Sequence, residues 1–203
     1  MTPSTPTRTE QLTSLAATLR RVRWFCVAFG AVQFAVYEGP PGLQVPHTVK
    51  PWGVAVCAWL VVTNVVSALG SRRDDVDGLE RTAAIEIAMD AALILFVIGL
   101  LAFDPYGTEW GLLCVVALEG ALRLDARGSA ACWLATSAAY IGVQVWAHST
   151  YGIYDRWTLL TFRLGIVLVV AFIAGGLATQ LRRHLESSRR AREEAHERAR
   201  LLR

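Results

Sequence analysis

The strongest constraint in this sequence is a series of long apolar runs that carry almost no charge and are joined by short polar connections. A helix needs about 17–25 residues to cross the hydrocarbon core of a bilayer, and six runs approach or reach that length. The sequence therefore predicts an all-α, polytopic membrane protein. We expect a bundle of six transmembrane helices over residues 22–38, 51–70, 82–103, 109–124, 129–147 and 157–180.

The overall composition excludes the commonest alternatives. Charged residues make up 18% of the chain and the mean hydropathy is +0.38, whereas a soluble domain carries about 25% charged residues. This argues against a soluble enzyme and makes the lipid bilayer the first expected partner. The net charge of +3 does not indicate nucleic-acid binding, because in a membrane protein it reflects an asymmetry between the two sides.

The basic residues predict the orientation. All but three of the 20 lie in the first 23 residues, the second connection, the fourth connection or the last 22 residues. Because basic loops face the cytoplasm, both termini are predicted to be cytoplasmic. Nearly all of the basic residues are arginine, which is typical of a high-GC bacterium, so the bacterial plasma membrane is the expected location. Residues 1–21 are polar and rich in Thr and Ser, and we expect a disordered arm there.

A few ionisable residues fall inside the predicted spans, where charge is costly and often functional. Glu86 and Asp90 share one helix face, as do Glu119 and Arg123, since each pair is four residues apart. These charges either hold the bundle together as ion pairs or form a ligand or proton site. The ligand-binding or signal-binding candidates are Glu86, Asp90, Asp104, Trp110, Glu119, Arg123 and Arg163, with the 104–110 loop as an outer lid.

Arg163, in the sixth span, has two alternative partners. Asp90 is about 9 Å away along the membrane normal by helix rise, a gap that a water or a tilted helix would close. Asp104 or Glu109, at the outer boundary, is equally reachable.

Aromatic residues gather at the predicted outer boundary. Such rings prefer the headgroup layer, so a plain anchoring belt is the first interpretation and a shallow cavity for an apolar ligand is the second. The residues are Tyr37, Trp52, Tyr106, Trp110, Trp146, Tyr151, Tyr154 and Trp157.

The sequence predicts no catalytic residue, no metal site and no cofactor in this region. None of the four histidines lies in a span, which argues against haem, and His47 with His148 lacks a set of further ligands. The four cysteines lie in separate apolar runs without C-x-x-C spacing. We therefore expect that this region is not an enzyme.

Residues 181–203 are predicted to continue the sixth span as a cytoplasmic helix, since no Gly or Pro follows Gly176. Their spacing resembles a weak coiled-coil seam, and small residues in the span favour close helix packing or dimerisation. We expect a signalling helix that leads to an output domain beyond this sequence, with a basic stop-transfer tail as the alternative. The predicted dimerisation and transmission residues are Ala171, Gly175, Ala178, Leu181, Leu185, Ser188, Ala195 and Leu202.

Three motifs resemble the N-terminal membrane region of actinobacterial sensor proteins, namely GGDEF diguanylate cyclases and sensor histidine kinases. They are Asp104-Pro105-Tyr106-Gly107-Thr108-Glu109-Trp110, Leu118-Glu119-Gly120-Ala121-Leu122-Arg123 and Phe162-Arg163. The resemblance covers residues 80–203, including the Arg/Glu-rich exit helix. It implies a homodimeric input module whose sixth span alters the pairing of downstream catalytic domains.

The expected function is thus a membrane-integral sensory input and dimerisation module. Its stimulus would be a small-molecule or lipid ligand of unknown identity, and no nucleic acid is involved. A small transporter or channel, or a purely structural membrane anchor, remains the alternative.

Overall fold

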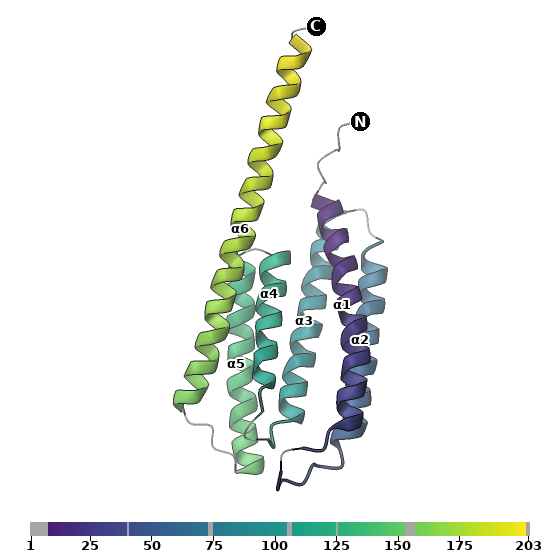
Figure 1. The fold of residues 1–203 in the computed structure, drawn as a ribbon, viewed down its shortest axis with the longest axis vertical. Helices are drawn as coiled ribbons and strands as arrows, with labels where there is room; N and C mark the ends of the chain where they lie inside the picture. Colours follow the sequence, from purple (N-terminus) through teal and green to yellow (C-terminus); the bar gives the residue numbers. More distant parts are fainter. Residues whose placement is uncertain are drawn as a thin grey trace.

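The fold is described from a computed structural model, which covers residues 8–39, 41–72, 75–104, 107–124, 126–152 and 157–201. Within these ranges the chain forms helices and no strand, so the all-α prediction is confirmed there. Figure 1 shows the helices α1 (Arg8–Val36), α2 (Val49–Gly70), α3 (Val76–Leu100), the 3-10 helix η1 (Glu109–Leu112), α4 (Leu113–Arg123), α5 (Ala126–Tyr151) and α6 (Trp157–Leu201).

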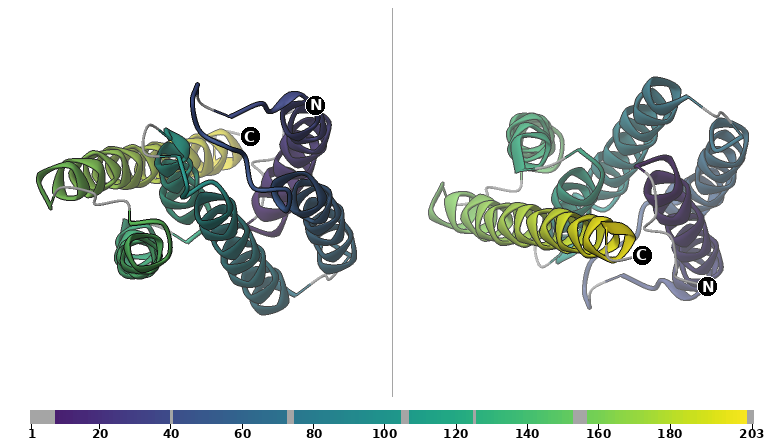
Figure 2. Two further views of the ribbon diagram at one scale, coloured as in Figure 1. Left: turned by 90° about the horizontal axis from the view of Figure 1, so that it is seen from below. Right: turned by 90° about the horizontal axis from the view of Figure 1, so that it is seen from above.

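The helices form two groups of three. In the first trio α1 packs on α2 and α2 packs on α3, while in the second trio α4, α5 and α6 each contact the other two. Helix α3 joins the trios by packing on α4 and α5, and Figure 2 shows α1 and α2 on the far side of α3 from α5 and α6. Both chain ends lie at one end of the bundle, which we call the terminal end (Figure 1).

Each predicted span falls on a helix, but the boundaries and the properties of those helices differ from expectation. Three are long and apolar enough to cross a membrane, namely Val49–Gly70, Val76–Leu100 and Trp157–Leu181. Helix α4 has only 11 residues and is preceded by the single turn of η1. The prediction of a polytopic helical protein is therefore supported for three helices.

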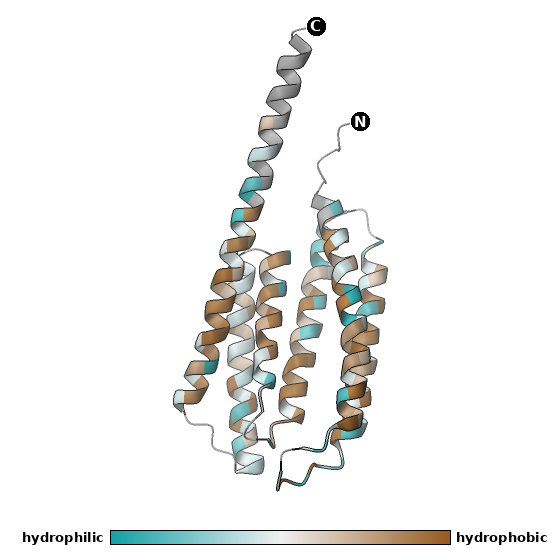
Figure 3. Cartoon of the chain, in the orientation of Figure 1, coloured by the Kyte–Doolittle hydropathy of each residue, from teal (hydrophilic) through white to brown (hydrophobic). Residues whose placement is uncertain are grey.

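The surface of the bundle is apolar and part of its interior is charged, the reverse of a soluble protein. Phe25 of α1 is 68% exposed and Phe172 of α6 is 82% exposed, whereas Glu86 is only 1% exposed. Figure 3 shows apolar colour over much of α1, α4 and the part of α6 within the bundle, and polar colour where α6 leaves the bundle. Such a surface is stable where lipid, and not water, surrounds it.

The predicted disordered arm is wrong for residues 8–21, which form the first turns of α1, and residues 1–7 lie outside the described part. No Gly or Pro interrupts this stretch. The Thr13 hydroxyl donates to the Thr9 carbonyl at 2.9 Å, which satisfies it within the helix. Leu12 is buried, so tertiary packing also stabilises helix where composition alone indicated disorder.

Glycines allow two neighbouring helix pairs to approach closely. A Cβ at Gly70 would clash with Thr82 Cγ2, because the end of α2 lies directly against α3 there. A Cβ at Gly120 would lie 2.8 Å from Cys132 Sγ, because α4 lies equally close to α5 next to Glu119. A larger residue at either position forces the helices apart.

We predict that Gly120→Ala lowers the free energy of unfolding by about 1–3 kcal/mol through overpacking. Gly142→Ala is the matched control, because a Cβ at Gly142 on α5 meets nothing within 4 Å. Thermal unfolding in detergent measures both. Equal midpoints for the two variants would contradict the close approach of α4 and α5.

Candidate functional site

A buried cluster of two arginines and three carboxylates lies in the half of the bundle nearer the terminal end. Its centre is Arg23 of α1. The Arg23 Nε and Nη2 atoms donate to Asp90 Oδ2 at 3.0 and 2.5 Å, and Nη1 donates to Glu86 Oε2 at 2.9 Å. Nη2 also donates to Glu119 Oε1 at 3.2 Å. One guanidinium on α1 therefore binds carboxylates from both α3 and α4.

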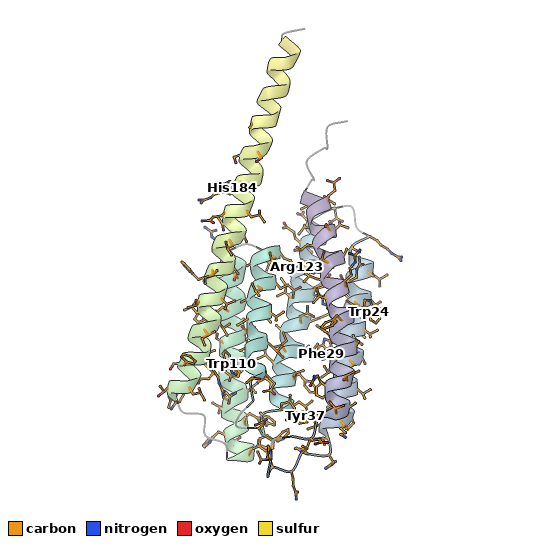
Figure 4. All side chains as sticks on the ribbon, viewed as in Figure 1. Trp24, Phe29, Tyr37, Trp110, Arg123 and His184 are labelled. Atoms are coloured by element: carbon orange, nitrogen blue, oxygen red, sulfur yellow. The ribbon has the colours of Figure 1, made fainter. Side chains whose placement is uncertain are left out.

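Arg123 completes this arginine–carboxylate cluster, which consists of Arg23, Glu86, Asp90, Glu119 and Arg123. Its Nη2 donates to Glu86 Oε2 at 2.8 Å, and its Nε lies 3.3 Å from Glu119 Oε1. Figure 4 labels Arg123 near the terminal end of α4. Glu86 and Glu119 each contact both arginines, so the five side chains form one connected network.

Helix periodicity explains how the network assembles. Glu86 and Asp90 are one turn apart on α3, and Glu119 and Arg123 are one turn apart on α4, so each pair shares a face. Gly120 holds α4 close to α5 at the same level. Four of the five members were predicted as site residues from sequence, and the structure brings those four together.

Arg23 is the member that sequence reasoning missed. It was counted with the basic residues of the N-terminal arm, yet it is 5% exposed and lies within the predicted span 22–38. Its apolar neighbours Val22, Trp24 and Phe25 were the available signal. An arginine embedded in an apolar run needs a carboxylate partner, because the bare charge is costly there.

The cluster joins the two trios. Moving an ion out of water costs several kcal/mol, and attraction offsets this only where geometry and hydrogen bonding are good. Arg23 crosses from the first trio to Glu119 of the second, and Arg123 crosses back to Glu86. Separating the trios would leave these charges unpaired in an apolar environment, so the network fixes how they face each other.

A second, smaller polar site surrounds Arg163 towards the opposite end of the bundle. Its Nη1 donates to the Tyr140 hydroxyl at 2.9 Å, and the guanidinium carbon lies 6.0 Å from the centre of the Trp110 ring. Figure 4 places Trp110 well away from Arg123. Arg163, Trp110 and Tyr140 line a cavity of about 30 Å³, together with Asp104 and Glu109.

The predicted pairing of Arg163 with Asp90 is wrong, since Arg23 of α1 supplies the partner of Asp90. The alternative, in which Arg163 lies near Asp104 and Glu109, agrees with their shared cavity. The seven predicted ligand residues therefore separate into two groups. Glu86, Asp90, Glu119 and Arg123 belong to the cluster, whereas Asp104, Trp110 and Arg163 belong to the opposite cavity.

Some of the predicted boundary aromatics line an apolar groove between α2, α3 and α5. Trp52, Trp146 and Tyr151 contribute to a groove of about 560 Å³ that Phe96 and Leu95 also line. The Trp52 and Phe96 rings meet edge to face at 5.4 Å. The interpretation as a shallow apolar cavity thus applies to these three aromatics, while Tyr106 and Tyr154 lie outside the described residues.

The small residues of α6 pack within the protomer. Ala171 and Ala178 are 4% and 8% exposed, and Gly175 is also buried, so these three members of the predicted dimerisation and transmission set are packed inside the protomer. They permit close packing of α6, which was the other interpretation of small residues at this spacing. Leu181 is exposed and Ser188 lies on the exposed part of the helix. Of the remaining predicted residues, Leu185 and Ala195 belong to α6, but the structure describes only their backbone. Leu202 lies outside the described residues.

Metal-ligating side chains do not gather in the described ranges. No group of three or more His, Cys, Asp or Glu side chains there is arranged to hold a metal ion. The four cysteines are half-buried and free, each on its own helix.

We predict that Arg23→Gln lowers the free energy of unfolding by about 3–5 kcal/mol, because it leaves buried carboxylates without a cation. The control is Arg21→Gln, an exposed position two residues earlier on the same helix, where we expect a change within about 0.5 kcal/mol. Denaturant or thermal unfolding in detergent measures both. A similar, small effect of the two variants would show that the cluster does not hold the trios together.

Comparison of the chain with known protein families, with curated proteins and with solved structures gave no match.

Proposed function

We propose that this chain is a membrane-integral sensory input module that transmits a signal through α6 to an output domain on the cytoplasmic side. The observation that carries the proposal is the continuity of α6, a single helix of 45 residues. Its first half packs in the bundle, with Ala171 and Ala178 buried, and its second half projects beyond the other helices (Figure 1). A rigid helix of this kind carries a shift at one end to the other.

The remainder of the predicted architecture belongs to the same proposal. Six crossings with both termini in the cytoplasm are consistent with both chain ends lying at one end of the bundle. The positive-inside distribution of arginine favours that end as the cytoplasmic one. The motif resemblance supports a histidine kinase or diguanylate cyclase as the output, in a homodimer and in a bacterial plasma membrane.

Besides the direct packing of α4 on α6, a polar contact through Ser129 of α5 couples the charged cluster to α6. Its hydroxyl lies 3.0 Å from the Ala117 carbonyl of α4 and 3.1 Å from the Ala171 carbonyl of α6. Ala117 is two residues from Glu119. A hydroxyl has one proton to donate, so it favours one carbonyl or shares the bond between both. A shift of α4 therefore changes a contact that α6 also uses.

Insertions that change the rotational phase of the projecting part of α6 test whether the helix transmits a signal. One residue inserted after Leu185 rotates everything beyond it by about 100°, whereas seven residues restore the phase to within about 20°. With a histidine kinase output fused behind the helix, we expect the single insertion to change kinase activity and the heptad insertion to leave it near the starting value.

Two outcomes would contradict this function. Unchanged kinase activity with both insertions would identify the bundle as a membrane anchor. Uptake of a solute into vesicles that contain only residues 1–203 would identify a transporter or channel.

We further predict that Ser129→Ala weakens the coupling of the cluster to α6 at a stability cost of about 1 kcal/mol. The measurement is a double-mutant cycle on the fused kinase, in which Arg123→Gln, which removes a cluster cation on α4, changes activity in the wild-type background and has a smaller effect in the Ser129→Ala background. Ser149→Ala is the control, since its hydroxyl donates to the Trp146 carbonyl within its own helix. An effect of Arg123→Gln that is equally large in the Ser129→Ala background would contradict a contribution of Ser129 to the coupling.

A further inference from the structure

The arginine–carboxylate cluster contains more acidic than basic groups. Arg23 and Arg123 supply two positive charges, while Glu86, Asp90 and Glu119 supply three negative ones. With every group ionised, the cluster has one surplus negative charge. Four of its five members are nearly inaccessible, with exposures of 1% to 5%. An uncompensated charge at such a position is strongly unfavourable, so the surplus needs a counter-charge.

Asp90 and Glu119 are the two carboxyls placed to share a counter-charge. Their Oδ2 and Oε1 atoms bind the same nitrogen, Arg23 Nη2, at 2.5 and 3.2 Å, and the two side chains lie within hydrogen-bonding reach of each other. The other oxygen of Asp90, Oδ1, is buried and has no hydrogen-bond partner. Two carboxyls this close do not both ionise readily, and sharing one proton removes the repulsion.

The neighbouring cation on α1 is Arg20, one turn from Arg23, and its Nη1 atom donates to Ser71 Oγ at the end of α2 at 3.1 Å. At this level α1 contributes Cys26 besides Arg23, and α5 contributes Cys132, and neither thiol carries positive charge. On α6 the buried residues facing the bundle here are alanines. Glu86 and Arg123 are already counted within the cluster. The described residues also offer no metal-binding group of three His, Cys, Asp or Glu, which favours a proton over a metal ion.

Helix α2 adds neutral polar groups at the same level. Gly30 lies opposite Cys57 on α2, and Gly70 lies opposite Thr82 on α3. This antiparallel register places Asn64 level with Arg23 and Asp90. Asn64 is 3% exposed, and neither of its side-chain polar atoms has a partner. The level of the carboxyl pair therefore contains further unused hydrogen-bonding capacity.

We propose that Asp90 and Glu119 hold one exchangeable proton between them, which makes the cluster a proton-binding site. Loss of this proton to water leaves both carboxyls ionised and restores the surplus charge, with no other change in bonding. A cavity of about 10 Å³ lies on the terminal side of the cluster and touches Glu86 and Arg123. It has room for about one water beside Glu86 and Arg123, so a proton exchanging from this side would pass the outer part of the cluster before it reaches the carboxyl pair.

The proton site stands on charge and geometry, and only its use as a stimulus rests on the proposed function. If both hold, the cytoplasmic proton concentration is a signal that the module receives. Deprotonation would weaken the contact between α3 and α4 at the join of the trios.

Infrared spectroscopy of the purified full chain in liposomes tests the site directly. At neutral pH we expect the carbonyl band of a protonated carboxylic acid, which shifts in D₂O and disappears at high pH. Asp90→Asn and Glu119→Gln should each remove the band, since either substitution makes the remaining charges equal. Asp77→Asn, an exposed acid on α3, is the control and should retain it. Absence of the band from the wild-type chain, or its persistence in both variants, overturns the proposal.

The pH dependence of wild-type unfolding is a second test that needs no variant. The folded chain would bind one proton that the unfolded chain, with its carboxyls in water, releases. Stability therefore falls as pH rises from above the ordinary carboxyl range, about 4, until the folded site itself releases its proton, by up to about tenfold in the unfolding equilibrium per pH unit. Asp90→Asn should flatten this slope. A melting temperature that follows sodium concentration at fixed pH, with no such slope, would assign the counter-charge to a metal cation and overturn the proposal. Neither result changes the outcome of the helix-phase experiment on the fused kinase, so failure of the proton site can be distinguished from failure of the proposed function.

Discussion

The pairing of Arg23 with carboxylates on two other helices is the interaction on which the rest of the bundle depends. Apolar packing within lipid has little directional preference, because lipid tails and aliphatic side chains are alike. A buried guanidinium is different, since it is stable in one arrangement of acceptors only. Arg23 requires Asp90 and Glu86 from α3 and Glu119 from α4, and Arg123 then requires Glu86 in return. These requirements fix the rotation of α1, α3 and α4 and the way the two trios meet.

The two polar sites differ in what they can transmit. Arg163 contacts Tyr140 of α5 and the Trp110 ring of η1, beside a small cavity that Ile98 of α3 also lines. The arginine–carboxylate cluster spans both trios and lies at the end from which α6 projects. A charge imbalance in this cluster therefore acts directly on the ion pairs that join the two trios.

Sequence reasoning predicted the helical class, the approximate place of each helix and four of the five cluster residues, because apolar runs and charges inside them are visible in a linear pattern. It did not predict that Arg23 of α1 is the cation that pairs with Asp90. Pairing Asp90 with Arg163 rested on depth along the membrane normal, whereas lateral position, which places α1 beside α3, comes from packing between helices distant in sequence. The helix over residues 8–21 was missed for a related reason, since burial of Leu12 depends on contacts with other helices. The alanines of α6 have a spacing that suits packing within a protomer or between protomers, and only their burial distinguishes these cases.

Helix α4 is the element best suited to convert charge into movement. It is the shortest α-helix of the bundle, begins with a 3-10 turn and contributes two of the five cluster members. Its Ala117 carbonyl meets the Ser129 hydroxyl, which also reaches the Ala171 carbonyl of α6. Seven of its 11 residues are buried and it packs on α3, α5 and α6, so a displacement of α4 is passed directly to these helices. The long α6, in contrast, moves as one body because its hydrogen-bonded backbone is uninterrupted from Trp157 to Leu201. The combination of a short helix that carries two cluster residues and a rigid long helix packed against it gives the proposed signal a direction, from the cluster through α4 to the projecting end of α6.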